Sequence, residues 1–262
     1  MPAAPPTAYL LDLDGTLYAA DAAVPGAPAA LARLRERGTP FRLVTNTTSR
    51  SRRMLVERLA GYGLVAGPEE IVTATLAGAT LLRARGLSRV APFVPPAALE
   101  DLAGVSLLGG TSERPWGPAD AVVLGDLGDR WTYGLLQEAF DQLMAGAALV
   151  ALSRDRYFRQ GDRLALDAGP FVAALEYAAG TPAEVAGKPS AAFFQAAVST
   201  LGLTPGPGIV MVGDDLWSDV QGAQRAGLQG WLVRTGKFRL DVLQRADVTP
   251  DRVLDSVAEL GL

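Results

Sequence analysis

Two aspartates separated by one residue, Asp12 and Asp14, follow a short apolar segment and precede Gly15. Side chains two residues apart on a strand point to the same face, so both carboxylates can face one ligand. Such a pair can bind a hard cation. It can also divide the roles of nucleophile and acid or base, because like charges at close range force their pKa values apart. The plainer interpretation is an Asx turn with solvated acids that closes the strand.

A second group of acids, Asp214, Asp215 and Asp219, follows the apolar segment from Ile209 to Val212. Metal coordination would explain why three acids converge at the carboxyl end of a buried strand. Acids at a helix N-terminus, each favoured by roughly 0.3 to 1 kcal/mol through the helix dipole, explain Asp215 and Asp219 equally well. The dipole explains Asp214 less well.

Neutral and cationic groups complete the candidate chemistry. A run of hydroxyls and one amide, residues 45–49, follows the apolar segment from Phe41 to Val44 and could cradle phosphate oxygens, although Ser49 serves equally well as a helix cap. Lys188 is one of only two lysines among 24 basic residues, the other being Lys237. It lies in a Gly-Lys-Pro sequence before a predicted helix, where it suits phosphate binding or simple solvation.

The composition excludes several kinds of chemistry. The 262 residues contain no Cys and no His, which removes thiol nucleophiles, thiolate metal sites and imidazole bases. Carboxylates, hydroxyls and amides remain, and these suit Mg²⁺ rather than zinc or copper. A formal net charge of -4 predicts no nucleic-acid partner. The absence of a signal-like N-terminus and of long apolar runs predicts a soluble cytoplasmic protein without a membrane partner.

The elements that must position these groups alternate between short apolar runs and amphipathic segments, which predicts an α/β fold with a doubly wound parallel sheet. One half of the sheet lies near the N-terminus, and the other lies between about residues 190 and 233. We expect residues 1–75 and 179–262 to form this domain. Residues 76–178 have strands and helices of their own and are predicted to form an inserted α/β unit, with a surface loop at residues 109–119.

Taken in order, Asp12 to Thr16, Val44 to Asn46, Lys188 and Gly213 to Asp215 resemble the four motifs of the haloacid-dehalogenase-like hydrolases. The resemblance implies a Rossmann-like core sheet, and the insertion is similar to the cap domain of the class IIA branch. That branch includes NagD, 4-nitrophenylphosphatases, pyridoxal phosphate phosphatase and the phospholysine phosphohistidine inorganic pyrophosphate phosphatase group. The chain looks most similar to the last group, on the segments at residues 155–157 and 234–237.

The resemblance implies that Asp12 is the nucleophile, which forms an aspartyl phosphate, and that Asp14 is the general acid and then the base. It also implies that Mg²⁺ is held by the Asp12 carboxylate, the Asp14 main-chain carbonyl and Asp214. Either Asp215 or Asp219 would support these ligands.

The phosphoryl group would be held by Thr45, Asn46 and Lys188, with Thr16 beside the metal ligands. These roles also follow from the resemblance. They are physically coherent, because phosphoryl transfer mainly requires in-line positioning and neutralisation of charge on the equatorial oxygens.

In relatives of this branch, the loop that matches Tyr157, Phe158 and Arg159 helps to select the substrate. Phe158 and Arg159 stand where pyridoxal phosphate phosphatases carry His-Pro, so that substrate is not expected here. An aromatic group beside an arginine could bind a planar or anionic leaving group, whereas the plainer interpretation is that Tyr157 and Phe158 are packed. The resemblance also implies a homodimer through the cap.

The expected function is therefore Mg²⁺-dependent hydrolysis of a small phosphorylated metabolite. A receiver-like phosphoacceptor is one alternative, but it would lack the second acid, Asp14, and the large insertion. A dehalogenase of the same fold would also lack an acid at that position. A protein without catalytic activity that only binds its ligand is the third alternative.

Overall fold

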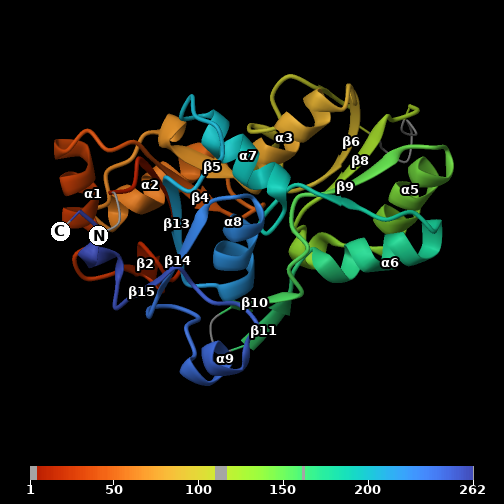
Figure 1. The fold of residues 1–262 in the computed structure, drawn as a ribbon. Coiled ribbons are helices and arrows are strands. Elements are labelled where there is room, and N and C mark those ends of the chain that lie inside the picture. The colour runs from red at the N-terminus through yellow and green to blue at the C-terminus, as the bar shows by residue number, and fades with distance from the viewer. Residues whose placement is uncertain (1–4, 110–116, 161–162, 262) are drawn as a thin grey trace. The chain divides into compact units, whose positions relative to one another are not determined.

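The computed structural model describes residues 5–109, 117–160 and 163–261, which form two compact units (Figure 1). The first unit comprises the described residues of Met1–Thr45, Arg52–Val72 and Lys188–Leu262, and the second comprises those of Asn46–Ser51 and Thr73–Gly187. Both units combine parallel strands with helices, which confirms the predicted α/β fold class. Among the described residues, no helix is long and apolar enough to cross a bilayer.

A six-stranded sheet forms the centre of the first unit, in the order β15-β14-β13-β1-β4-β5. Its strands are β1 (Ala8–Asp12), β4 (Phe41–Thr45), β5 (Ile71–Thr73), β13 (Ile209–Gly213), β14 (Gln229–Val233) and β15 (Arg252–Leu254). β1 is parallel to both β4 and β13. β1 and β13 are buried along their whole length, as expected of strands covered on both faces. Strands from both ends of the chain therefore share one sheet, as predicted.

Helices and short turns accompany this sheet. They are α1 (Ala27–Glu36), α2 (Arg52–Gly61), η1 (Pro68–Glu70), α7 (Ala191–Ser199), η3 (Leu216–Gln221), α8 (Gly222–Arg225), α9 (Leu240–Arg245) and η4 (Val257–Glu259). In α1 the buried residues Ala27, Ala30, Leu31 and Leu34 recur at helical spacing and pack into the core. Asp215 and Asp219 were expected at the N-terminus of a regular helix. The chain instead makes the π-helical segment η3 before α8 begins.

A small antiparallel hairpin follows β1 directly. It consists of β2 (Tyr18–Ala19) and β3 (Ala22–Ala23). Tyr18 is buried within the core cluster of the first unit, whereas Ala19 is exposed. The hairpin is therefore anchored to the core by its first residue.

The second unit has its own sheet of five strands, in the order β12-β9-β8-β6-β7 and parallel throughout. The strands are β6 (Arg89–Phe93), β7 (Ser106–Leu107), β8 (Ala121–Leu124), β9 (Ala148–Ala151) and β12 (Glu184–Val185). Its helices are α3 (Ala74–Ala84), α4 (Pro96–Leu99), η2 (Gly128–Arg130), α5 (Tyr133–Met144) and α6 (Gly169–Ala179). An antiparallel hairpin joins β10 (Tyr157–Gln160) to β11 (Arg163–Leu166).

The limits of the second unit follow from its strand pairing. Its sheet continues past α6 because β12 pairs with β9, so the unit extends to Gly187, beyond the expected end at residue 178. The short segment from Asn46 to Ser51 also belongs to it. The predicted loop at residues 109–119 lies largely outside the described residues.

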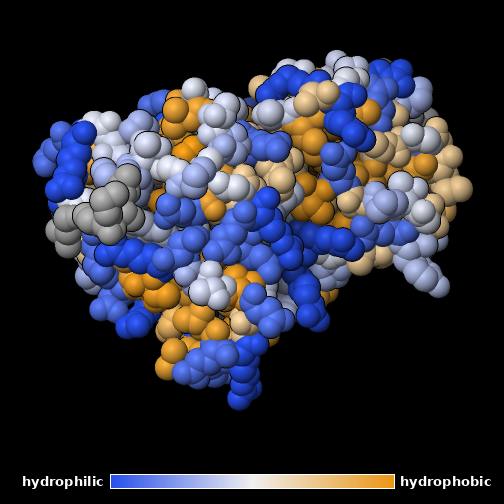
Figure 2. All heavy atoms as spheres, viewed as in Figure 1, coloured by the Kyte–Doolittle hydropathy of each residue, from blue (hydrophilic) through white to orange (hydrophobic). Residues whose placement is uncertain are grey.

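The edge of the first sheet formed by the carboxyl ends of β1, β4 and β13 carries the candidate residues. Leu11 lies opposite both Val212 and Leu43, so the three strands end side by side. Their carboxyl ends bring Asp12, Thr45 and the residues after Gly213 to one edge, where ligands bind in open parallel sheets. In Figure 2, hydrophilic and hydrophobic residues both appear on the visible face, and hydrophobic residues reach the surface near α9.

Candidate active site

Three buried carboxylates meet at this edge of the sheet. Asp12 ends β1, Asp214 follows β13, and Asp219 lies in η3. Each offers an oxygen atom within 4.8 Å of the others, and each residue is at most 7% exposed. The fold thus brings together two of the acids that the sequence predicted as metal ligands and one of the two predicted to support them.

The π-helical segment η3 gives Asp215 and Asp219 different surroundings. Asp215 is the N-cap, and its carboxylate accepts hydrogen bonds from the backbone N–H groups of Trp217 and Ser218, each at 3.0 Å. Asp219 turns back towards β13, where a Cβ atom on Gly213 would lie only 2.1 Å from its Oδ2. Glycine at 213 therefore leaves space for Asp219 to join the buried carboxylates.

Lys188 ties two of these acids together. Its ammonium nitrogen lies 2.5 Å from Asp12 Oδ1 and 2.6 Å from Asp219 Oδ1, and the residue is 5% exposed. Burial by itself would lower the pKa of Lys188. The two carboxylates outweigh this effect and hold the pKa above its usual value, so the ammonium stays charged.

Burial and the closeness of the three acids make their ionised forms unfavourable. Burial raises the pKa of Asp214 to about 8, and the charges of Asp12 and Asp219 add to the effect. Burial likewise raises the pKa of Asp219 to about 7 despite the opposing charge of Lys188, and it raises the pKa of Asp12. Three buried carboxylates facing one ammonium leave excess negative charge, and hard oxygen donors of this kind suit a divalent cation such as Mg²⁺.

A loop near the C-terminus, residues 235–237, packs with Gly15 around the carboxylate of Asp214. These residues are called the seat of Asp214. The backbone N–H of Lys237 donates to Asp214 Oδ2 at 2.7 Å, and the hydroxyl of Thr235 donates to the carbonyl of Gly15 at 2.5 Å. Gly15 and Gly236 have φ values of 81° and 62°, and a Cβ atom on either would lie 2.0 Å from Asp214 Oδ2. Residues 234–237 were expected to matter only through a resemblance, and no role in holding Asp214 was predicted for them. The second lysine beside a glycine was the available signal.

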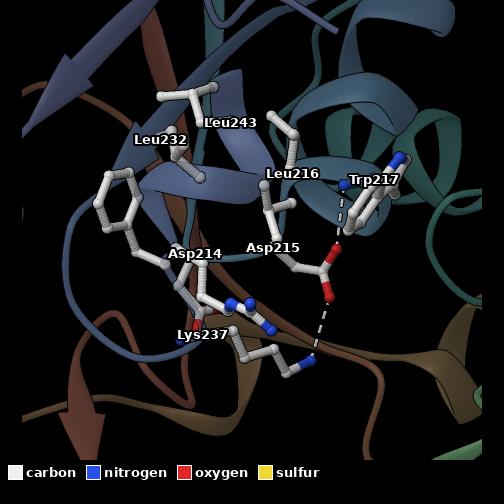
Figure 3. A pocket seen from close by; sticks show the side chains of 10 residues that line it. Asp214, Asp215, Leu216, Trp217, Leu232, Lys237 and Leu243 are labelled. Carbon is white, nitrogen blue, oxygen red and sulfur yellow. Dashed lines mark hydrogen bonds and ion pairs between the residues drawn. The ribbon is translucent and has the colours of Figure 1, made fainter. Parts of the chain in front are cut away.

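A cavity of about 110 Å³ lies beside this seat. Figure 3 shows one carboxylate oxygen of Asp215 directed to the backbone of Trp217 and the other to the ammonium of Lys237, at 3.2 Å. The cavity is lined by apolar side chains, including Leu216, Leu232 and Leu243. Burial would raise the pKa of Asp215, but Lys237 and the backbone donors outweigh it and lower this pKa. Asp215 is therefore an ionised cap and ion-pair partner.

Asp14 stands outside the buried group. Its side chain is exposed, and its main chain forms an isolated bridge with Tyr18. Thr16 is fully buried, and its hydroxyl has no hydrogen-bond partner among the described residues. Thr45 is buried at the end of β4, next to the end of β1. Asp14 and Thr16 therefore lie close to Asp12 along the chain, and Thr45 lies close to it on the neighbouring strand. Of the three, Asp14 has an exposed carboxylate.

The remaining predicted residues belong to the second unit. Asn46 Nδ2 donates to Asp155 Oδ2 at 3.2 Å, so its amide orders the loop that leads into β10. Tyr157 and Phe158 are 54% and 36% exposed, which argues against the plain packing interpretation. The backbone of Arg159 lies in β10, whereas its side chain is outside the described part of the structure.

Two family models match the chain. The model described as haloacid dehalogenase-like hydrolase matches residues 9–107, and the model described as HAD-hydrolase-like matches residues 185–260. Together they cover all four motif segments, and the first match extends into the second unit.

Relatives are similar over nearly the whole length of the chain. The haloacid dehalogenase-like hydrolase domain-containing protein 2 of Bos taurus is 44% identical, over 88% of this chain and 85% of that protein. The phospholysine phosphohistidine inorganic pyrophosphate phosphatase of Homo sapiens is 35% identical, over 95% of this chain and 91% of that protein. A solved structure of glycerol phosphate phosphatase from Mycobacterium tuberculosis in complex with magnesium is 30% identical and has a TM-score of 0.85. Its alignment covers 97% of this chain and 76% of that chain.

Proposed function

Because the chain belongs to the haloacid dehalogenase-like hydrolases, we propose that it is a Mg²⁺-dependent phosphatase that hydrolyses a small phosphorylated metabolite. The observation that carries this proposal is the buried group of Asp12, Asp214 and Asp219 with Lys188 in contact. The donor set fits Mg²⁺, which would be held by Asp12 and Asp214 together with the main-chain carbonyl of Asp14. The ion supplies positive charge to the phosphoryl oxygens when it is bound.

In the proposed reaction, a carboxylate oxygen of Asp12 attacks phosphorus as the bond to the leaving-group oxygen breaks. Asp14 donates its proton to that oxygen. Asp14 then removes a proton from a water molecule, whose oxygen attacks phosphorus and releases Asp12 as a free carboxylate with inorganic phosphate. The exposure of Asp14 suits this role, because its carboxyl must reach first the leaving-group oxygen and then a water molecule.

Lys188 has two functions in this proposal. It orients the Asp12 carboxylate through the 2.5 Å contact, and its positive charge would offset the negative charge of the transferring phosphoryl group. Asp219 pairs with the same ammonium nitrogen at 2.6 Å, so a second buried carboxylate fixes the position of the Lys188 side chain. Thr45 and Asn46 would donate hydrogen bonds to the same phosphoryl oxygens.

The second unit is proposed as the cap that encloses the substrate, with Tyr157, Phe158 and Arg159 beside the leaving group. The cavity at the base of the β10–β11 hairpin, lined by Arg154, Arg156 and Tyr157 among others, supports an anionic or planar leaving group. A homodimer through this unit and a cytoplasmic location remain predictions.

The proposal is tested by steady-state hydrolysis of a panel of phosphate esters that includes glycerol phosphate and 4-nitrophenyl phosphate. We expect activity with Mg²⁺, none after chelation with EDTA, and none for Asp12→Asn. Mass spectrometry of acid-quenched Asp14→Ala should find one phosphoryl group on the peptide that contains Asp12. Hydrolysis that persists undiminished in EDTA or in Asp12→Asn would overturn the proposal.

A further inference from the structure

The segment that carries Asp14 is hydrogen-bonded to the β2–β3 hairpin. Asp14 bridges Tyr18, and the N–H of Gly15 donates to the Tyr18 carbonyl at 2.7 Å. The N–H of Tyr18 donates in turn to the carbonyl of Leu13 at 3.2 Å. The main chain of Asp14 is thus fixed relative to Tyr18. The Asp14 side chain itself is exposed.

The side chain of Arg58, in α2, contacts both the first strand and the turn of this hairpin. Its guanidinium carbon lies 4.9 Å from the ring centre of Tyr18 and 5.7 Å from that of Tyr62. Its Nε donates to the Tyr62 hydroxyl at 3.1 Å, and its terminal nitrogen donates to the Ala20 carbonyl at 3.4 Å. The two tyrosine rings are themselves in contact, with centres 5.4 Å apart. Arg58 therefore joins the anchored strand of the hairpin to its turn.

The turn of the hairpin is a place where such support is needed. Ala20 has a φ of 52°, a left-handed conformation that residues with a Cβ atom rarely adopt. Conformations of this kind persist only where the surroundings hold them. The hydrogen bond that the Ala20 carbonyl accepts from Arg58 is one such constraint.

The chemistry of arginine fits this task better than that of lysine. A planar guanidinium can stack on an aromatic ring while its edge donates hydrogen bonds in two directions, whereas an ammonium is a compact point charge. Burial by itself would lower the pKa of Arg58, but its hydrogen bond to Tyr62 and the charge of Asp14, among others, raise it. Asp14 is therefore within electrostatic reach of Arg58.

We propose that Arg58 is a positioning residue for Asp14: by clamping the β2–β3 hairpin, it keeps the Asp14 carboxyl aligned with the leaving-group oxygen. This inference rests on the proposed function, in which Asp14 is the acid. Arg58 does not itself touch the substrate in this proposal, and its effect passes through Tyr18 and the main chain of residues 13–15.

The test uses the dependence of the reaction on the leaving group. An alkoxide such as that of glycerol phosphate needs a proton to depart, whereas 4-nitrophenolate leaves without one. The value of kcat/KM reports the first chemical step, in which Asp14 acts as the acid, so a misplaced Asp14 should slow alkyl esters selectively. We expect Asp14→Asn to lose about 10²-fold or more on alkyl esters relative to 4-nitrophenyl phosphate. Arg58→Met should show the same selective loss at about tenfold, because a small displacement of a catalytic group is costly.

Two further variants make the outcome specific. Arg58→Lys keeps a positive charge but loses the planar stack. It should show a selective loss on alkyl esters that is smaller than that of Arg58→Met. Arg53→Met is the matched control on the same helix, because the Arg53 side chain is 64% exposed and pairs with Glu57. It should leave the ratio of the two esters unchanged.

An equal loss on both esters for Arg58→Met, or no loss, would overturn the inference. If Arg58→Met fails to fold, Tyr62→Phe decides the matter. This variant removes only the hydroxyl that accepts from Arg58, and it should give a smaller selective loss, whereas an unchanged ratio would count against the inference. If Asp14→Asn itself shows no selective loss on alkyl esters, the proposed acid role of Asp14 fails instead. The two failures are therefore distinguishable.

Discussion

The charged group at the end of β1 and the β10–β11 hairpin of the second unit present their candidate side chains in opposite ways. Asp12 and Lys188 are 7% and 5% exposed and contact each other directly. Tyr157 and Phe158 are 54% and 36% exposed on a two-stranded hairpin. The first region is fixed by several mutual bonds, and the second offers side chains that have few contacts to lose.

This difference matches the two tasks that a phosphatase must perform. Stabilising a charged transition state requires groups whose positions are set before the substrate arrives, because reorganisation during the reaction is costly. Choosing among leaving groups requires surface that can change without damage to the catalytic centre. Substitutions in the first region should therefore affect stability, metal binding and rate together, and those in the second should affect preference alone.

The largest effect is expected for Lys188→Met, which keeps the length of the side chain and removes its charge. Asp12 and Asp219 would be left buried without a partner, so unfolding should become easier by about 3 to 5 kcal/mol. Phosphatase activity should fall with it. Urea unfolding and steady-state kinetics measure the two effects.

The second lysine of the chain provides the matched control. Lys237 is 70% exposed in its pair with Asp215, so Lys237→Met should cost at most about 1 kcal/mol in unfolding free energy. Equal stability losses for the two lysine variants would contradict the contrast between buried and exposed pairs.

Metal binding should separate Asp219 from Asp215. Asp219 lies in the buried carboxylate group, whereas Asp215 caps η3 and pairs with Lys237. Asp219→Asn should raise the Mg²⁺ concentration for half-maximal activity by about 10- to 100-fold, and Asp215→Asn should raise it less. Titration of activity with Mg²⁺ gives both values, and the reverse order would assign the supporting role to Asp215.

An intermediate effect is expected for Gly236→Ala, because the new methyl group would meet the carboxylate of Asp214. The positive φ of 62° adds a strain of roughly 1 kcal/mol for alanine. Gly227→Ala is the matched control, since it has a φ of 83° and nothing within 4 Å of its Cβ position. Both variants should lose thermal stability, but only Gly236→Ala should weaken Mg²⁺ activation. If Mg²⁺ activates Gly236→Ala and Gly227→Ala equally well, the seat of Asp214 has no effect on metal binding.

The sequence predicted the residues that lie at the ends of strands better than those that lie on turns. Asp12 and Asp214 could be placed because parallel strands end at one edge of the sheet. The separation of Asp219 from Asp215 could not be predicted, since it depends on a π-helical segment where a regular helix was expected. The seat of Asp214 and the clamp by Arg58 join residues that are distant in the chain, and neither has a periodic signal. The extension of the second unit to Gly187 depended on a two-residue strand, too short to recognise in the sequence.

The smallest effect on the fold is expected for the β10–β11 hairpin. Tyr157→Ala should change the unfolding free energy by no more than about 0.5 kcal/mol, as is usual for exposed positions, and we predict a similarly small change for Arg159→Ala. Their hydrolysis of 4-nitrophenyl phosphate should be nearly unchanged, because the fixed catalytic group remains intact. The ratio of kcat/KM between anionic and neutral metabolite esters should instead shift by about tenfold for Arg159→Ala, which removes a charge from the proposed leaving-group site. A substrate panel with an unshifted ratio would remove Arg159 from that site. A general loss of rate would mean that the hairpin also serves catalysis, and the contrast between the two regions would then fail.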